Sequence, residues 1–253
     1  MFSFDATPVK FIGLLVLFVW CTGWSVYELT RPQGVRQRVS NGLHLGMAVV
    51  MLLMVARPTW TTLTSVVPTG VWAGVFALAT GWFAWLTVDA FRACDKHGRL
   101  HFAGHATMFA AMTWHLAAMA SMAAGMSGAM NSASHHDMGS HAHSAATMAD
   151  WMTAQAQPGG VLWWFALIGI PLMTYLLAAS FVAAKRALAP DPARTVVRVG
   201  GPSRDHQCHE ERAQTSATAR LAAASDFAMN FGMFWMSTGL LVPILPFFAL
   251  LAF

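Results

Sequence analysis

Residues 101–126 read HFAGHATMFAAMTWHLAAMASMAAGM, and the spacing within this stretch decides the fold that we predict for the chain. Its histidines and methionines recur alternately four and three residues apart. This average repeat of 3.5 residues indicates a helix whose seam packs against neighbouring helices at a shallow angle. The seam contains His101, His105, Met108, Met112, His115, Met119, Met122 and Met126.

Two other hydrophobic stretches carry the same spacing, so the pattern is not confined to one helix. Their seams consist of His44, Met47, Met51 and Met54, and of Met229, Met233 and Met236. Of the 17 methionines in the chain, only Met1 and Met173 lie outside the three seams and residues 127–158. We expect the three helices to be parallel to one another and their seams to face each other.

The composition indicates a membrane protein. Hydrophobic residues make up 56% of the chain and charged residues only 10%, whereas a soluble domain has about 25% charged residues. Six stretches reach the length of about 20 residues that a membrane-spanning helix requires. We therefore predict an all-α integral membrane bundle of six transmembrane helices, near residues 10–30, 39–57, 69–91, 101–126, 160–184 and 227–252.

The connections between these stretches suggest three parts of the chain. Residues 1–186 hold the first five spans together with a Met/His-rich loop at 127–158, and residues 226–253 hold the sixth span. Residues 187–225 form a polar linker rich in proline and glycine. The last part of this linker, residues 210–224, is rich in alanine and arginine, so it is expected to extend the sixth span as a helix.

The basic residues predict the orientation of the bundle. Thirteen of the 15 lysines and arginines lie in alternate connections, which leaves only Lys10 and Arg57 on the other side. Because basic connections stay in the cytoplasm, we expect both termini and the loop at 127–158 to be extracytoplasmic, and the linker at 187–225 to be cytoplasmic. The predicted location is the plasma (inner) membrane. Topology then explains the basic character of the chain, so the lipid bilayer is its partner and no nucleic acid is needed.

The side chains in the seams favour copper as the ligand. Soft ligands select soft metals, so thioether and imidazole groups together favour Cu(I), whereas zinc sites usually use thiolate, imidazole or carboxylate. We therefore predict a copper-binding protein that serves transport, storage, or delivery of the ion to another membrane protein. The predicted ligands within the spans are His44, Met47, Met51, Met54, His105, Met108, Met112, His115, Met119, Met122, Met126, Met229, Met233 and Met236. Those in the outer loop, which would capture or release the ion, are His135, His136, Met138, His141 and His143.

Two other interpretations of the same residues stay open. Methionines at seam spacing also serve as adaptable packing, which would make the protein a non-catalytic assembly or scaffolding subunit of a membrane complex. Alternatively, two histidines on different helices are the usual axial pair of an intramembrane b-type haem. Such a haem would serve electron transfer, with axial ligands among His44, His101, His105 and His115.

Motifs of the common enzyme classes are missing from the sequence. We find no Ser/His/Asp order, no phosphate-binding loop and no zinc-protease motif. The sequence therefore points away from an enzyme, and any transport is expected to be passive or driven by a gradient.

Three segments resemble a known family. They are RVSNGLHLGMAVVMLLMVA at 38–56, GWFAWL at 81–86 and HATMFAAMTWHLAAMASM at 105–122. They resemble an actinobacterial family of multi-pass membrane proteins known as a domain of unknown function, the 5134 type. Its members are similar in pairing a GLH-x-x-MA helix with a Met/His helix, a methionine-rich outer loop and a methionine-bearing last span. The resemblance implies a topology and supplies no reaction.

Overall fold

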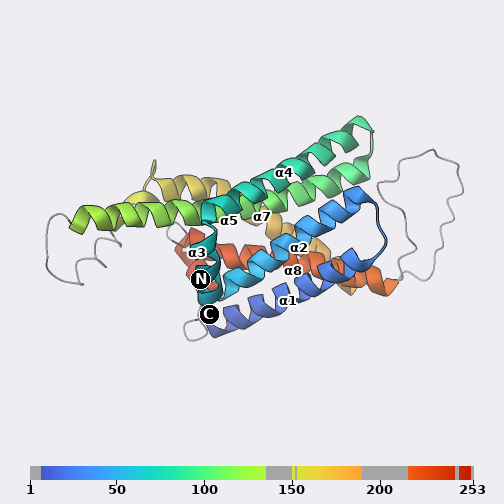
Figure 1. The fold of residues 1–253 in the computed structure, drawn as a ribbon, viewed down its shortest axis with the longest axis horizontal. Coiled ribbons are helices and arrows are strands. Elements are labelled where there is room, and N and C mark those ends of the chain that lie inside the picture. Colours follow the sequence, from blue (N-terminus) through green and yellow to red (C-terminus); the bar gives the residue numbers. More distant parts are fainter. Residues whose placement is uncertain (1–6, 135–149, 152, 190–215, 243–244, 252–253) are drawn as a thin grey trace, which may run out of the picture.

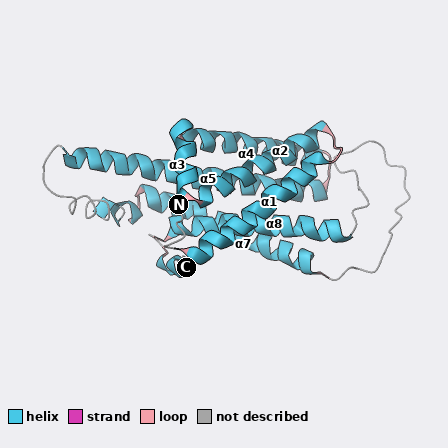
Figure 2. Ribbon diagram, turned by 60° about the horizontal axis from the view of Figure 1, so that its bottom comes forward, coloured by secondary structure: helices cyan, strands magenta, loops and turns pink. Residues whose placement is uncertain are grey.

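Helices form all the elements of the computed structural model, which describes residues 7–134, 150–151, 153–189, 216–242 and 245–251 (Figures 1 and 2). The long helices lie side by side along one axis, while a short one runs across them at one end (Figure 1). The elements are α1 (Pro8–Thr30), α2 (Val35–Val55), α3 (Arg57–Val66), α4 (Thr69–Arg92), α5 (Lys96–Ser134), α7 (Val161–Leu188), α8 (Ser216–Leu241) and the 3-10 helix η1 (Pro246–Leu251). The predicted all-α class is confirmed for the described residues.

Four of these helices are long and apolar enough to cross a membrane, namely α1, α2, α4 and α7. Their outward faces carry large apolar side chains that water would not favour. Val16 of α1 is 62% exposed, Leu78 of α4 is 78% exposed and Phe181 of α7 is 62% exposed. Exposed apolar surface of this extent marks an interaction with another apolar phase. The helices therefore indicate a protein that lies in a lipid bilayer.

Contacts between helix ends show how the bundle is ordered. Arg36 in the first turn of α2 forms an ion pair with Asp89 at the end of α4, with 3.2 Å between Nη1 and Oδ2. Arg220 near the start of α8 donates a hydrogen bond from Nε to the carbonyl oxygen of Ala187 at the end of α7. We call this the basic end of the bundle. The helices α2, α5 and α8 all start there and run in the same direction (Figure 1), as their seams predict.

The turn between α4 and α5 is tight and capped. Cys94 adopts a φ of 57°, in the left-handed region, and the amide of Asp95 bonds back to the carbonyl oxygen of Ala90 at 3.0 Å. This arrangement satisfies carbonyl groups at the end of α4. The Asp95 carboxylate then accepts a hydrogen bond from the amide of Gly98 at 3.0 Å, which caps the first turn of α5. Three residues thus reverse the chain and fix where the seam of α5 begins.

Glycines bring α1 and α8 close together. A Cβ atom added at Gly13 of α1 would lie 2.6 Å from the ring of Trp235, and one added at Gly232 of α8 would lie 2.6 Å from the ring of Phe18. On each of the two helices, an aromatic ring of the other helix therefore packs against a glycine. Close approach over small residues is the usual way in which helices associate within a membrane. This contact fixes α8 against α1 and so sets the position of its seam.

The observed boundaries differ from the predicted ones in three places. The predicted loop at 127–158 starts too early, because α5 continues to Ser134 on residues such as Ala129 and Met130 that favour helix. The predicted linker at 187–225 is shorter among the described residues, since α7 ends at Leu188 and α8 begins at Ser216. The sixth span, predicted at 227–252, ends as an α-helix at Leu241. Pro243 and Pro246 follow, and proline cannot donate a helical hydrogen bond.

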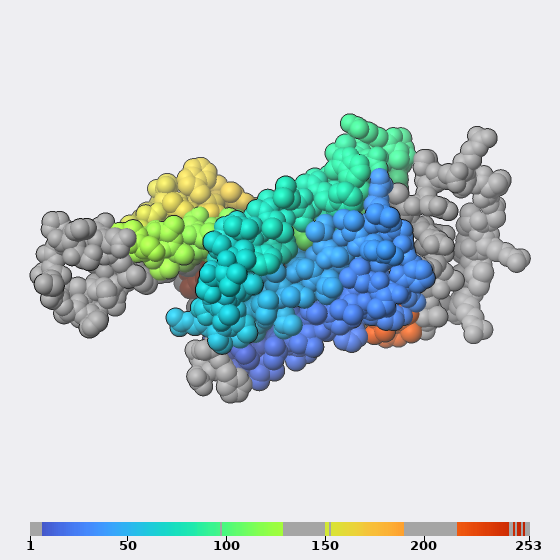
Figure 3. All heavy atoms as spheres, viewed as in Figure 1, coloured from blue at the N-terminus to red at the C-terminus, as the bar shows by residue number. Residues whose placement is uncertain are grey.

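Two features of the end opposite the basic end were not expected from the sequence. The helix α5 has 39 residues, so it is roughly 58 Å long and extends beyond the other helices (Figure 1). The short helix α3 lies across this end and buries Trp60, while its threonines remain on the surface. The space-filling view in Figure 3 shows α3 and α4 beside α1 and α2 on the near face.

Candidate functional site

Eight methionines from the three seam helices are buried in the core of the bundle. They belong to a single hydrophobic cluster, and each is 5% exposed or less. They are Met47, Met51 and Met54 of α2, Met108 and Met112 of α5, and Met229, Met233 and Met236 of α8. We call this set the methionine layer. The seams of the three helices therefore face a common interior, and the seam spacing identified its members.

A chain of three histidines lies between the methionine layer and the basic end. His44 of α2 contacts His105 of α5, with 2.9 Å between Nε2 of His44 and Nδ1 of His105. Nε2 of His105 then lies 3.1 Å from Nε2 of His101, one turn earlier on α5. At the other end, Nδ1 of His44 lies 2.7 Å from the carbonyl oxygen of Ser40. We call His44, His105 and His101 the histidine chain.

Aromatic rings of α4 and α5 enclose the inner member of this chain. The His44 ring meets Phe83 edge-on at 5.4 Å between centroids and Phe109 at 5.3 Å. The two phenylalanine rings stack on each other at 5.0 Å. Trp82 donates a hydrogen bond from Nε1 to the Ser40 hydroxyl at 3.4 Å. The packing thus holds the His44 ring in one orientation toward His105.

A second polar cluster lies on the other side of the methionine layer. His115 of α5 bonds through Nδ1 to the hydroxyl of Ser237 at 2.8 Å. Next to it in α8, Thr238 accepts a hydrogen bond from the Lys10 ammonium at 2.9 Å. Lys10 is only 1% exposed and His115 only 4%. From the basic end, the interior thus contains the histidine chain, then the methionine layer, and then a second polar level with His115 and Lys10.

The predicted ligands are only partly brought together. His44 and His105 adjoin each other, whereas His115 turns to Ser237. Met119, Met122 and Met126 are only partly buried, on the part of α5 that leads away from the core. In the described part of the chain, no group of three or more His, Cys, Asp or Glu side chains converges to hold a metal ion. The loop residues His135, His136, Met138, His141 and His143 lie outside the described residues.

The separation of His44 and His105 limits what can lie between them. Metal–nitrogen bonds of about 2.0–2.1 Å hold two imidazole nitrogens about 3.3 Å apart at tetrahedral angles, whereas Nε2 of His44 and Nδ1 of His105 are 2.9 Å apart. Two axial histidines on opposite faces of a haem iron would be farther apart still. In the described arrangement these two nitrogens hydrogen-bond to each other, so any ion between them would require the rings to move apart.

Lys10, Ser237, Thr238, Phe83 and Phe109 were not among the predicted site residues. Lys10 was assigned to the outer connection on the basis of its charge, yet it lies inside α1 and is buried. Its position as the third residue of an apolar helix was the available signal, because an ionisable residue within a span is a functional candidate by default. Ser237 and Thr238 gave no such signal, since hydroxyl residues are common in membrane helices.

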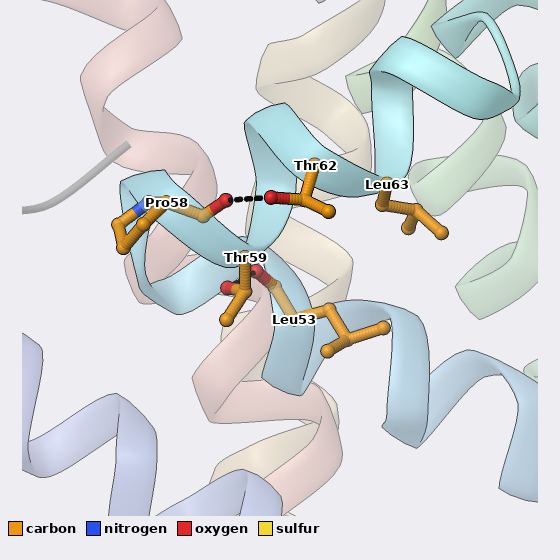
Figure 4. Close-up of a pocket in the computed structure, with 5 residues that line it drawn as sticks. All are labelled: Leu53, Pro58, Thr59, Thr62 and Leu63. Carbon is orange, nitrogen blue, oxygen red and sulfur yellow. Dashed lines mark hydrogen bonds between the residues drawn. The ribbon is translucent and has the colours of Figure 1, made fainter.

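A shallow open groove lies apart from these levels, where α2 meets α3 (Figure 4). It is lined by Leu53, Pro58, Thr59, Thr62 and Leu63. The threonine hydroxyls bond to the backbone: Thr59 donates to the Leu53 carbonyl oxygen at 2.6 Å and Thr62 to that of Pro58 at 2.9 Å. The groove therefore presents mainly apolar surface and no group that titrates.

Comparison with known protein families shows to which family the chain belongs. A family described as "Domain of unknown function (DUF5134)" matches residues 36–238, which include both polar levels except Lys10. The chain belongs to this family. The resemblance predicted from the GLH and Met/His segments is thereby confirmed. Neither the curated proteins nor the solved structures contain a match to the chain.

The family match covers the helices that form the candidate site. It begins at Arg36, in the first turn of α2, and ends at Thr238, in the last turn of α8. All eight methionines of the methionine layer and all three residues of the histidine chain fall within it. Because the description of the family names no activity, the function of the site has to be argued from its chemistry.

Proposed function

We propose that this DUF5134 protein binds copper, as Cu(I), in the methionine layer between α2, α5 and α8. The observation that carries the proposal is the burial of eight thioethers from the three seam helices in the core of the bundle, whose hydrophobic cluster also includes Met173 of α7. The wider picture is a bundle of six spans in the plasma (inner) membrane, in which α5 and α8 cross the bilayer with the four more apolar helices. The basic end faces the cytoplasm, and both termini and the Met/His-rich loop lie outside.

The chemistry of the thioether supports a monovalent soft ion. A methionine sulfur is polarisable and uncharged, so it selects Cu(I) over harder cations. It also has no proton to lose, so a thioether site holds its ion without depending on the pH outside. The ion brings one positive charge into the bundle, and apolar surroundings tolerate one charge better than two. A site of this kind suits passage, storage or delivery of copper.

The orientation rests on the basic residues. Arg36, Arg92, Lys96 and Arg220 belong to the turns at the basic end, and positive charge is retained in the cytoplasm. With this orientation the extended end of α5 projects outward and leads to the loop at 127–158. The partly buried Met119, Met122 and Met126 would then connect that loop to the methionine layer.

Two alternatives predict different results for the same protein. In a scaffolding subunit the methionines only fill space, and conservative replacements leave every binding property unchanged. In a b-type haem protein the iron would take an imidazole on each face, which requires His44 and His105 to separate from their contact at 2.9 Å. The adjacency of these histidines on two helices is the one observation that favours haem.

Metal analysis of matched variants tests the proposal. Met51, Met112 and Met233 each come from a different seam helix and are all 0% exposed. Replacing the three with leucine conserves volume, so the fold is expected to lose no more than about 1.5 kcal/mol per site. The control is Met173→Leu, because Met173 is a buried methionine of α7 outside the seams.

Protein purified with Cu(I) is expected to retain at least one copper ion per chain in the wild type and in Met173→Leu. The triple variant is expected to lose most of it. Equal copper content in all three proteins would contradict the proposal and favour scaffolding. A Soret band in the absorption spectrum, without copper, would favour haem.

A further inference from the structure

We propose that the histidine chain is a proton relay, which carries a proton from the basic end of the bundle to the edge of the methionine layer. The relay itself depends only on the hydrogen bonds of the histidine chain. Its coupling to copper rests on the proposed function. In this relay His44 and His105 carry protons. The sequence alone predicted them to be metal ligands.

The Ser40 carbonyl fixes the direction of every hydrogen bond in the chain. A carbonyl oxygen only accepts, so Nδ1 of His44 must carry a hydrogen and donate it across the 2.7 Å contact. In neutral His44, Nε2 is then an acceptor. Nδ1 of His105 must therefore donate across 2.9 Å, which leaves Nε2 of His105 to accept from Nε2 of His101 across 3.1 Å. One carbonyl thus sets the tautomer of three imidazoles.

A chain with this polarity transmits a proton in three balanced steps. A hydronium ion gives a proton to Nδ1 of His101, which becomes an imidazolium, and the hydronium leaves as water. His101 then passes its Nε2 hydrogen to Nε2 of His105, and His105 passes its Nδ1 hydrogen to Nε2 of His44. At the end His44 carries the positive charge, and the other two rings are neutral again in their opposite tautomers. Both transfers between rings use hydrogen bonds that already exist, so neither transfer requires a ring to turn.

The exposure of the three rings fits an inward path. His101 is on the surface, His105 and His44 are partly buried, and Met47, three residues after His44, is 0% exposed. The chain therefore has one end that meets solvent and one that meets the methionine layer. Beyond His44 the hydrogen bonds stop at the Ser40 carbonyl, so a proton delivered there stays on His44.

Aromatic rings line the inner end of the chain at His44. Phe83 of α4 and Phe109 of α5 lie within 5.4 Å of its ring centre, in edge-on contact. His105 is the titratable group that faces it from α5. The charged groups of α2 and α4 are Arg36, Arg38, Asp89 and Arg92. Of these, Arg36 and Asp89 form an ion pair at the basic end. Lys96 and Arg99 belong to the first turn of α5.

A proton on His44 and a Cu(I) ion beside Met47 would repel each other, because both are positive charges in a poorly screened interior. Binding of the ion should therefore drive the proton back along the chain to solvent. Thioether ligands release no proton when they bind a metal. Protons released on copper binding would consequently report the relay and not the ligands of the ion.

The first test measures the tautomers of the three histidines by 15N NMR on the full chain in lipid nanodiscs, above the pH at which they titrate. We expect hydrogen on Nδ1 of His44, on Nδ1 of His105 and on Nε2 of His101, with a correlation across the bond between His44 and His105. Hydrogen on Nε2 of His44 would overturn the relay. This test requires no metal, so it decides the relay even if the protein binds no copper.

The second test counts protons released as Cu(I) is added to weakly buffered protein at a pH low enough for His44 to carry a proton. Two variants interrupt the chain: His105→Phe in its middle and His101→Gln at its exposed end, where folding tolerates a change. The matched control is Thr107→Val, at a similar depth of α5. The Thr107 hydroxyl donates a hydrogen bond to the carbonyl oxygen of Ala103 in the same helix.

We expect wild type and Thr107→Val to release protons in proportion to bound copper. Both interrupting variants should bind the same amount of copper while proton release falls to near zero. Undiminished proton release in the two variants would overturn the relay. Parallel loss of copper and protons would overturn it as well, because the histidines would then be ligands of the ion. Absence of copper from the wild type would count against the proposed function alone.

Discussion

The Lys10 ammonium lies 2.9 Å from the Thr238 hydroxyl and joins the first turn of α1 to the last turn of α8. Thr238 itself donates to the carbonyl oxygen of Trp235 at 2.8 Å, so its oxygen is oriented to accept from Lys10. This contact closes the bundle at the end opposite the basic end. It also places a buried lysine one residue from Ser237, which holds His115.

Replacing Thr238 with valine should destabilise the protein, because the Lys10 ammonium would lose its hydrogen bond to the Thr238 hydroxyl. A hydrogen bond to a charged group contributes about 1.5–3 kcal/mol. The measurement is the midpoint of thermal unfolding in detergent. Thr238→Ser retains the hydroxyl and should unfold near the wild-type temperature, so equal losses in the two variants would show that the methyl group and not the hydrogen bond matters.

The packing of α1 on α8 should be sensitive to volume at Gly232. A valine there would overlap the Phe18 ring, which would lie only 2.6 Å from its Cβ atom. Overpacking of this kind costs about 1–3 kcal/mol, which a lowered unfolding midpoint would reveal. Gly46→Ala is the control, since no atom lies within 4 Å of a Cβ added at Gly46. An unchanged midpoint for Gly232→Val would mean that the two helices do not approach as closely as described.

The orientation of the bundle can be read from cysteine labelling in intact cells. Cys94 is exposed in the turn between α4 and α5, at the basic end, whereas Cys21 is buried. With Cys208 replaced by serine, a membrane-impermeant thiol reagent should label Cys94 only after the cells are broken. Thr62→Cys, on the exposed face of α3, should be labelled without breakage. The opposite pattern would place the basic end outside.

The histidines of the outer loop should matter when copper is scarce. Replacing His135, His136, His141 and His143 with asparagine removes the imidazoles of the loop and retains hydrogen-bonding side chains. If the loop captures the ion, copper uptake by cells should weaken at low supply and recover at high supply. Uptake curves that coincide with the wild type at every concentration would mean that the loop is a spacer.

The seam spacing predicted most of the interior. A repeat of 3.5 residues depends only on which residues share a helix face, so the sequence identified Met51, Met112 and Met233 as interior positions before any contact was known. Burial of all three bears this out. The helix boundaries were less predictable, because Ala129 and Met130 favour helix in a stretch whose glycine, serine and histidine content resembles a loop.

The polar contacts could not be predicted from spacing. His44 and His105 share a depth on two helices, but whether they converge on an ion or bond directly depends on the rotation and separation of α2 and α5. Here the Phe83 and Phe109 rings and the Ser40 carbonyl decide it, and they come from three different helices. The contact of Lys10 was missed for a related reason, since its acceptor Thr238 lies 228 residues away in the sequence.

X-ray absorption at the copper edge tests the central claim most directly, because it reports which atoms surround the ion. The protein would be purified with Cu(I) under anaerobic conditions and measured beside the variant with Met51, Met112 and Met233 replaced by leucine. The account predicts a first shell dominated by sulfur in the wild type and a loss of that signal, together with the copper, in the variant. A first shell of nitrogen and oxygen only, or wild-type protein that retains no copper, would contradict it.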